Sequence, residues 1–151
     1  MTDSDSLLEH IRIGFPIQKY GRAVDSQDFA LFDEAFTAEA VLDYTHAGGP
    51  RGDRGTIAEW LRTSREGMVQ WQHHLSPPMI ELRGETASAR TDVYAPCFYA
   101  DADGAVTAFH TGGRYHDELV KKVDGWWICG RRFEATWSDG QDGATGPGPT
   151  S

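Results

Sequence analysis

The sequence has few cysteines, no long apolar run and no excess of basic residues, and each shortage argues against a class of protein. The two cysteines, Cys97 and Cys129, lie in apolar segments without a Cys-x-x-Cys pair, so neither a disulfide framework nor a structural zinc site is expected. No apolar run approaches the ~20 residues that span a bilayer. Residues 1–6 lack the basic and apolar regions of a secretory signal, which predicts a cytoplasmic protein.

The charge of the chain argues against polyanionic partners. It carries 14 basic and 23 acidic residues, a formal net charge of −9. Because phosphate backbones and anionic lipid surfaces are bound through basic patches, we expect neither a nucleic acid nor a membrane as partner. The length of 151 residues suits one folded domain. We expect that domain over residues 1–137 and a disordered tail over residues 138–151, which is rich in Gly, Pro and Ser.

Helical patterns occupy the first half of the chain. Apolar residues over 6–25 recur at helical spacing, but Pro16 should divide this stretch into two helices. A further short helix is predicted over residues 28–36. Thr56 and Glu59 match a capping box, which predicts a helix from there to about Gln70.

Strand patterns dominate the second half. Strands are predicted over residues 40–44, 73–82, 86–99, 105–123 and 126–137, with hairpin turns at 101–104 and 124–125 and a bulge at Gly112-Gly113. Helices followed by an antiparallel meander predict an α+β fold, in which the helices pack in the concavity of a curved sheet. Such a cone leaves an enclosed space at one end, where small-molecule sites commonly form.

Three groups of residues carry a family resemblance. They are Tyr20-x-x-Ala23-x-Asp25-x-x-Asp28-Phe29, then His73-His74 before Ile80-Glu81-Leu82, and finally Gly112-Gly113-x-Tyr115 with Asp124-Gly125-x-Trp127. In order and spacing, from about Leu7 to Trp137, the chain resembles the SnoaL-like family of the nuclear transport factor 2-like superfamily. The resemblance implies a cone-shaped, cystatin-like α+β barrel with a mixed sheet. It also implies a homodimer or homotrimer, since these proteins commonly associate through the sheet.

The resemblance further implies candidate site residues. The family includes scytalone dehydratase, bile-acid dehydratase, hexachlorocyclohexane dehydrochlorinase and polyketide cyclases, besides non-catalytic subunits. In the dehydratase and dehydrochlorinase branch, an Asp late in the first long helix pairs with a His at the start of a strand, and Asp25 and His73 match these positions. Tyr20 matches a tyrosine of bile-acid dehydratase, and His110 matches a second histidine of scytalone dehydratase. The C-terminal arginine of bile-acid dehydratase has no clear counterpart.

These residue types suit elimination from carbon. An imidazole titrates near neutral pH and can remove a proton next to a carbonyl or a leaving group. His73 is therefore the predicted base, and Asp25 would fix its tautomer. Tyr20, Tyr44 and His110 are the predicted donors to a substrate oxygen. We predict a cofactor-independent, metal-independent lyase of dehydratase type that acts on a small cyclic or polyketide-like apolar molecule.

Other functions use the same pocket. An isomerase or cyclase would move a proton without losing water, and an accessory subunit would bind a ligand without turnover. Asp25 also suits a helix cap, Tyr20 a core aromatic residue, and His73 a structural role. The sequence contains no Gly-x-Ser-x-Gly motif, so nothing in it indicates a serine hydrolase of that kind.

Strand alternation leaves two choices open. His73 and His74 must point to opposite faces of a regular strand, as must Arg131 and Arg132, so one of each pair can reach the pocket. A metal site is a weaker alternative, because no known ligand spacing joins its candidates, His73, His74, His110, His116 and Asp117.

Overall fold

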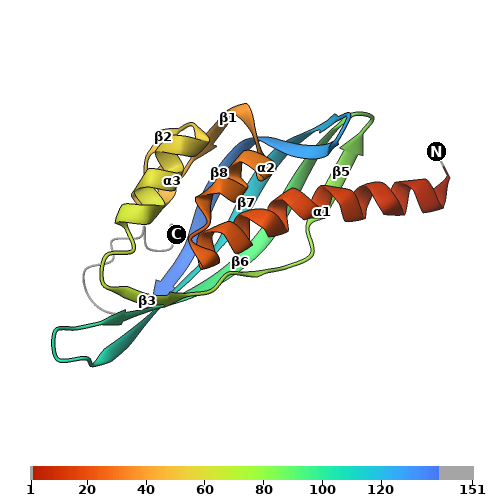
Figure 1. The fold of residues 1–151 in the computed structure, drawn as a ribbon. Coiled ribbons are helices and arrows are strands. Elements are labelled where there is room, and N and C mark those ends of the chain that lie inside the picture. Colours follow the sequence, from red (N-terminus) through yellow and green to blue (C-terminus); the bar gives the residue numbers. More distant parts are fainter. Residues whose placement is uncertain (1, 140–151) are drawn as a thin grey trace.

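The structure, a computed structural model, describes residues 2–139 as three α-helices packed against one curved, mixed sheet of eight strands (Figure 1). The helices are α1 (Asp3–Ser26), α2 (Phe32–Ala35) and α3 (Arg54–Thr63), with short 3-10 turns η1 (Phe29–Leu31) and η2 (Thr45–Ala47). The strands are β1 (Phe36–Asp43), β2 (Arg51–Gly52), β3 (Met68–Trp71), β4 (His74–Leu75), β5 (Met79–Arg83), β6 (Thr86–Ala100), β7 (Val106–Lys122) and β8 (Gly125–Asp139).

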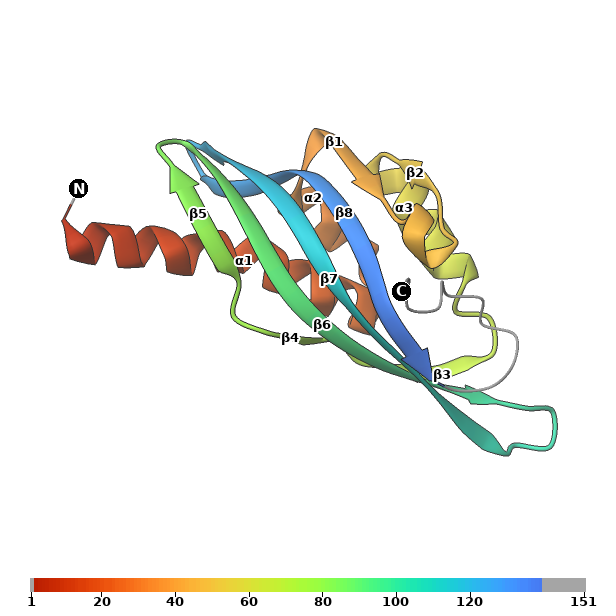
Figure 2. The ribbon, with the colours of Figure 1, turned by 180° about the vertical axis from the view of Figure 1, so that it is seen from behind.

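The long antiparallel meander β6-β7-β8 forms the centre of the sheet. The strand order is β2-β1-β8-β7-β6-β3, and β4 and β5 also pair with β6. Among the described strands only the β1–β8 pairing is parallel, so the sheet is mixed. The end strands β2 and β3 do not pair with each other, so the sheet does not close into a barrel. The helices lie on its concave face, and no described helix covers the other face, which Figure 2 presents. This arrangement confirms the predicted α+β fold.

Helix α1 is continuous, so the predicted break at Pro16 is wrong. Thr2 and Asp5 form a capping box at its start, in which the Asp5 amide donates to Thr2 Oγ1 over 3.2 Å. Pro16 lies within the helix, and its ring is buried together with Ile13 and Ile17. An internal proline costs about 3 kcal/mol in an exposed helix. Packing of this long apolar face against the sheet outweighs that penalty.

The segment around α3 differs from its prediction at both ends. The N-cap is Asp53, whose carboxylate accepts the Thr56 amide over 2.7 Å, so Thr56 lies inside the first turn. The helix ends at Thr63 and not near Gln70. Gly67, with φ +77°, then turns the chain into β3, which pairs with the edge of β6. The apolar spacing over residues 68–71 suits a helix or a strand, and the available strand edge decides between them.

Two further strand boundaries were predicted imperfectly. The strand expected over 73–82 is two short strands, β4 and β5, separated at Pro77 and Pro78, which cannot donate to a ladder. The last strand extends through Ser138 and Asp139, which pair with Thr111 and His110. The rest of the predicted tail lies outside the described residues.

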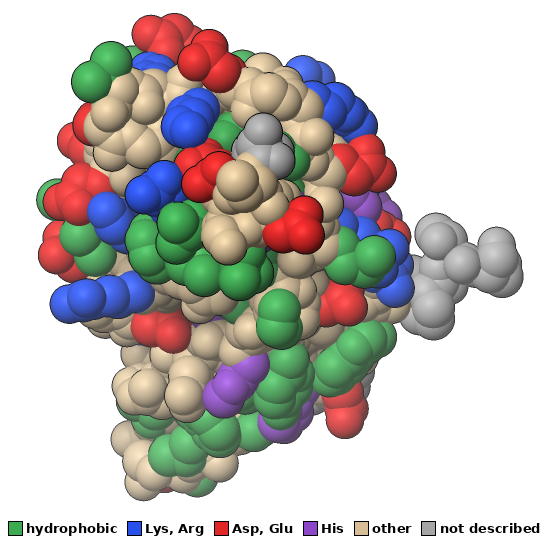
Figure 3. Space-filling model, turned by 90° about the vertical axis from the view of Figure 1, so that its right-hand side faces the viewer, with side chains coloured by type: hydrophobic (Ala, Val, Ile, Leu, Met, Phe, Trp, Pro, Cys, Tyr) green, Lys and Arg blue, Asp and Glu red, His purple; other side chains and the backbone are tan. Residues whose placement is uncertain are grey.

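The first half of α1 exposes apolar side chains. Leu7, Leu8, Ile11 and Phe15 are each about half exposed or more. Figure 3 views the molecule from the side where α1 begins, and hydrophobic side chains gather there among acidic and basic ones. Within residues 2–139, no helix is long and apolar enough to cross a membrane.

Glu9 fixes this half of α1 to the β7–β8 hairpin. Its carboxylate is nearly buried and accepts hydrogen bonds from Trp126 Nε1 at 2.7 Å and Arg12 at 2.9 Å, and it pairs with Lys121 at 3.0 Å. The bond from Trp126 and the contact with Lys121 lower the pKa of Glu9 from 4.5 to about 2. Since the pKa is lower in the folded state, the carboxylate stabilises the fold above pH 4.5, and this contribution is lost as the pH falls toward 2.

We therefore expect Glu9→Gln to lower the free energy of unfolding at neutral pH by about 2 kcal/mol, measured by urea denaturation. The difference from the wild type should shrink as the pH falls from 4.5 toward 2. The control is Glu34→Gln, since Glu34 pairs with Lys19 at the surface and its loss should cost no more than about 1 kcal/mol. Equal effects of the two substitutions would contradict this assignment.

Candidate active site

An aromatic cavity of about 120 Å³ lies between the concave face of the sheet and the elements that cover it. Side chains from α1, α3, η2, β3 and the three central strands form its wall. They are Tyr20, Tyr44, Ala47, Trp60, Leu61, Trp71, His73, Val93, Ala95, Thr111, Tyr115 and Phe133. The predicted space exists as a partly open pocket, and three of the five predicted site residues, Tyr20, Tyr44 and His73, line it.

The bulge predicted at Gly112-Gly113 helps to shape this wall. The register between β7 and β8 shifts there. A Cβ at Gly113 would lie 2.5 Å from the Phe133 ring, so only glycine allows the ring to pack over the strand. Phe133 in turn stacks on Tyr44, with 5.7 Å between the ring centroids.

Asp25 and His73 form a closely bonded pair. Asp25 lies in the last turn of α1, and His73 directly precedes β4. The backbone amide of His73 donates to both carboxylate oxygens, at 2.9 and 3.1 Å, and ring Nδ1 lies 2.6 Å from Oδ1. Because a carboxylate only accepts, Nδ1 carries a proton, and in the neutral imidazole Nε2 then holds the lone pair. Nε2 has no hydrogen-bond partner within residues 2–139, and the ring lines the cavity.

Two neighbouring residues allow this pair to form. Gly21 lies where α1 passes close to this segment, since a Cβ there would lie 3.2 Å from Leu75 Cδ1 and in ordinary contact with the Cβ of His73. Arg65 donates to the carbonyl of Val24 in the last turn of α1, and its guanidinium lies 5.5 Å from the Trp71 ring. Burial lowers the pKa of Arg65, and the negative charge of Asp25 partly opposes this effect. Arg65 therefore holds the end of α1 and the cavity wall together.

The structure resolves which of the paired histidines faces the cavity. The side chain of His73 is 3% exposed, whereas His74 points to the outer face of the sheet and stacks on Tyr94, with 5.8 Å between the ring centroids. His110 also lies on that outer face, where Nδ1 is 2.7 Å from the Tyr94 hydroxyl. Its neighbour Thr111 lines the cavity, so strand alternation turns His110 away. The structure does not bring His110 to the other candidates.

The tyrosine hydroxyls meet inside the cavity. Tyr44 donates to the Tyr20 hydroxyl over 2.7 Å, and both side chains are buried. Burial raises the pKa of Tyr20 and the pKa of Tyr44 well above the ordinary value, although the charge of Arg131 acts in the opposite direction. Both phenols therefore stay protonated across the physiological pH range and are able to donate to an oxygen.

A buried ion pair lies behind the tyrosines. Arg131 donates from Nε to Asp117 Oδ1 over 2.6 Å and from Nη2 to Oδ2 over 2.8 Å, and neither side chain is exposed. Its guanidinium carbon lies 4.3 Å from the centroid of the Tyr20 ring and 4.1 Å from that of Tyr115. Burial lowers the pKa of Arg131, but the charge of Asp117, its hydrogen bonds and the neighbouring tyrosines together outweigh burial and raise this pKa. Neither Arg131 nor Arg132 lines the cavity, and Arg131 lies beneath its wall.

The five candidate ligands of the weaker alternative, a metal site, do not lie together. They divide between the cavity (His73), the outer face (His74, His110 and His116) and the buried ion pair (Asp117). Among residues 2–139, no three His, Cys, Asp or Glu side chains lie close enough to hold a metal ion.

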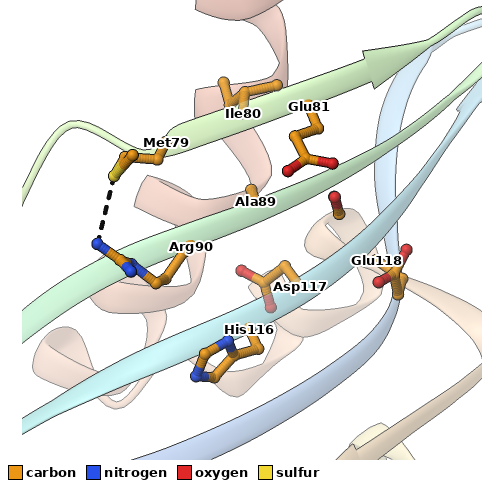
Figure 4. Close-up of a pocket in the computed structure, with 9 residues that line it drawn as sticks. Met79, Ile80, Glu81, Ala89, Arg90, His116, Asp117 and Glu118 are labelled. Atoms are coloured by element: carbon orange, nitrogen blue, oxygen red, sulfur yellow. Dashed lines mark hydrogen bonds between the residues drawn. The ribbon is translucent and has the colours of Figure 1, made fainter.

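A second hollow, of about 440 Å³, lies across β5, β6 and β7. Figure 4 shows Met79, Arg90, His116 and Glu118 around it, with Arg90 bonded to the sulfur of Met79. His116 is already bonded to Glu134, at 2.7 Å. The side chains of His116 and Glu134 are about one-third exposed to solvent, whereas that of His73 is 3% exposed, so the His73 cavity is the stronger candidate site.

Sequence reasoning missed part of the cavity wall. Trp60, Trp71 and Thr111 come from three separate elements, and only the folded chain brings them together. Asp117 entered the sequence argument only as a metal ligand. Its position two residues after Tyr115 on one strand was a usable signal, since both must face the same side.

The buried ion pair predicts a large effect on stability. Asp117→Ala would leave the Arg131 charge buried without its partner, so we expect the free energy of unfolding to fall by about 3–5 kcal/mol. Replacing both residues, by Asp117→Leu with Arg131→Met, should cost less than the single change. The surface control is Glu134→Ala, which loses contacts with His116 and Arg114 and should cost at most about 1 kcal/mol. A double variant less stable than Asp117→Ala would contradict this account.

Comparison with known proteins agrees with the fold and the family resemblance. The model of the SnoaL-like domain matches residues 7–132. An uncharacterized protein of Mycobacterium tuberculosis is 33% identical over 115 residues, which cover 76% of this chain and 76% of that protein.

Solved structures share the fold at lower identity. A candidate scytalone dehydratase from Novosphingobium aromaticivorans superimposes with a TM-score of 0.81 at 19% identity, covering 98% of this chain and 97% of that one. A hexachlorocyclohexane dehydrochlorinase from Novosphingobium barchaimii gives 0.76 at 12% identity, with coverages of 94% and 96%. The match of the domain model over most of the sequence shows that the chain belongs to the SnoaL-like domain family.

Proposed function

We propose that the protein is a cofactor-independent lyase that eliminates water, or a similar leaving group, from a small cyclic or polyketide-like apolar substrate. The observation that carries this proposal is the His73 ring, held by Asp25 through Nδ1, with its unbonded Nε2 in an aromatic cavity. A base fixed in one tautomer beside an apolar chamber is the arrangement that proton abstraction from carbon requires.

The elimination assigns one role to each residue. Nε2 of His73 removes a proton from a carbon next to a carbonyl or leaving group, and the electron pair of that C–H bond forms a carbon–carbon double bond. The bond to the leaving oxygen breaks with its electron pair moving to oxygen. Asp25 stabilises the imidazolium that forms. Tyr20, which accepts a hydrogen bond from Tyr44, donates to the carbonyl or to the departing oxygen. The departing oxygen takes the proton held by the His73 imidazolium and leaves as water, which returns His73 to its neutral form.

The cavity wall supports an apolar substrate. Seven of its side chains are hydrocarbon or indole: Ala47, Trp60, Leu61, Trp71, Val93, Ala95 and Phe133. Excluding water from such a site strengthens the hydrogen bonds to the reacting oxygen and prevents the base from being solvated. The solved relatives whose names include a dehydratase and a dehydrochlorinase fit an elimination, although at their identities they share only the fold with this chain.

The same pair of tyrosines favours a second candidate, an isomerase or cyclase. A hydroxyl pair bonded over 2.7 Å suits an enolate oxygen as well as a leaving hydroxyl. In that case His73 would return the proton to another carbon and no water would leave, so product analysis separates the two. The third possibility, a binding subunit without turnover, gives no reason for the His73–Asp25 bond. The expected homodimer or homotrimer stays a prediction.

The test of the proposal is the loss of the base. We expect His73→Ala to lower kcat by about 10²–10⁴-fold with the fold retained, because the proton has no other acceptor in the cavity. Asp25→Asn should also lower kcat strongly, since an amide leaves the ring less well oriented and the imidazolium without a charge partner. Both are measured by steady-state kinetics, with circular dichroism as the check on folding.

The matched control is the next residue along the chain. His74→Ala removes the same side chain from the outer face of the sheet, and kcat should stay within about threefold of the wild type. Unchanged turnover in a folded His73→Ala variant would remove His73 from the mechanism.

A further inference from the structure

We infer that the cavity selects neutral substrates built on a single six-membered ring, with one oxygen directed at the Tyr20–Tyr44 hydroxyl pair. The inference rests on the proposed function for the role of that oxygen, and it narrows the substrate class from cyclic or polyketide-like molecules to one-ring ketones and alcohols. It follows from the size of the cavity, from the charges around it and from the spacing of its polar groups.

The size of the cavity limits the substrate to one ring. An apolar cavity of about 150 Å³ in another protein holds one benzene molecule. A volume of about 120 Å³ therefore suits a single ring with small side-chain adjustments, and two fused rings exceed it.

The walls are poorly placed to move. The Trp60 ring packs directly on Gly49, where a Cβ would lie 2.5 Å from the ring. It also contacts Tyr44, with 5.4 Å between the ring centroids. On the other side, Trp71 lies between His73, at 5.0 Å, and the guanidinium of Arg65, at 5.5 Å. Each indole is thus held by a second neighbour behind the cavity wall.

The absence of a free cation in the cavity wall disfavours anionic substrates. No carboxylate, ammonium or guanidinium belongs to the lining residues of this cavity. Two cations lie behind lining rings: Arg131, which pairs with Asp117, lies behind Tyr20 and Tyr115, and Arg65 lies behind Trp71. A carboxylate in the cavity would lose its hydration without gaining a counter-ion, which is strongly unfavourable.

The phenols and the imidazole line the same small cavity. The Tyr20 and His73 rings meet edge to face with 6.1 Å between their centroids, and the Tyr44 hydroxyl bonds to that of Tyr20. An oxygen that accepts a hydrogen bond from Tyr20 and a C–H bond presented to Nε2 therefore belong on nearby atoms of one small ring. A cyclic ketone, or a ring alcohol with an adjacent acidic C–H, has this arrangement.

The experiment is a binding series followed by NMR, with the methyl groups of Leu61 and Val93 as reporters. The probes are cyclohexanone, 1-tetralone as its two-ring analogue, and benzoate as a charged single ring. We expect cyclohexanone to shift both reporters, and 1-tetralone and benzoate to bind at least about tenfold more weakly at neutral pH. The opposite order, equal affinities, or an absence of cyclohexanone binding would overturn the inference.

Enlarging the cavity tests the size limit directly. Leu61→Ala removes a wall side chain, so 1-tetralone should bind about tenfold more tightly to the variant than to the wild type. The matched control is Leu119→Ala, an equally buried leucine on β7 that does not line the cavity and should leave the affinity unchanged. Val93→Ala is a milder enlargement for use if Leu61→Ala does not fold. No gain in a folded enlarged variant, or an equal gain in the control, would overturn the size limit.

The binding series and the kinetics fail independently. If one-ring ketones bind selectively but turnover of a ring alcohol does not depend on His73, the proposed elimination is wrong and the size limit stands. If His73-dependent turnover is found only with fused-ring substrates, the elimination stands and the inference about substrate size is wrong.

Discussion

The carboxylate of Asp25 accepts three hydrogen bonds from one residue, and the geometry of the cavity depends on them. Two come from the backbone amide of His73 and one from its ring, so both the position of the strand and the rotation of the imidazole are fixed by one side chain of α1. If only the imidazole ring were bonded to Asp25, the backbone of His73 could still move, and rotation about the bonds to Cβ could turn the ring. Because Asp25 also binds the backbone amide, the end of α1 and the start of β4 are joined as one unit. The imidazole then has one orientation, with Nε2 directed into the cavity.

The part of the core that lies against the concave face of the sheet contains several buried polar groups. Its concave face carries the Arg131–Asp117 pair and the tyrosine hydroxyls, and the Thr91 hydroxyl there is buried without a hydrogen-bond partner within residues 2–139. Buried charges and unpaired polar atoms oppose folding, and hydrophobic replacements of a buried ion pair are often neutral or stabilising. The aromatic rings on both sides of the guanidinium, at 4.1 and 4.3 Å, recover part of this loss through cation–π contacts.

The sequence predicted the fold class and the His73–Asp25 pair, and its failures have physical causes. The pair came from the family resemblance, since 48 residues separate the two positions and no spacing rule joins them. Pro16 was read as a helix break because propensity is local, whereas the buried face of α1 forms only against the finished sheet. Strand alternation shows which residues of β7 and β8 share a face, but not which face meets the helices. The orientations of His110 and Arg131 therefore could not be predicted. The cavity wall could not be predicted, because it joins residues from α1 to β8 at distances that only packing sets.

The polar interior also bears on what kind of protein this is. A scaffold needs only packing, and aliphatic residues at the positions of Arg131, Asp117 and Tyr20 would supply it without desolvated charge. The polar groups instead gather on one side of a small cavity, next to the only described imidazole that is fixed by a carboxylate and directed into that cavity. Local departures from an ideal core are expected where a site requires them. The gathering of Arg131, Asp117 and the tyrosines beside one cavity supports the proposed chemistry at His73.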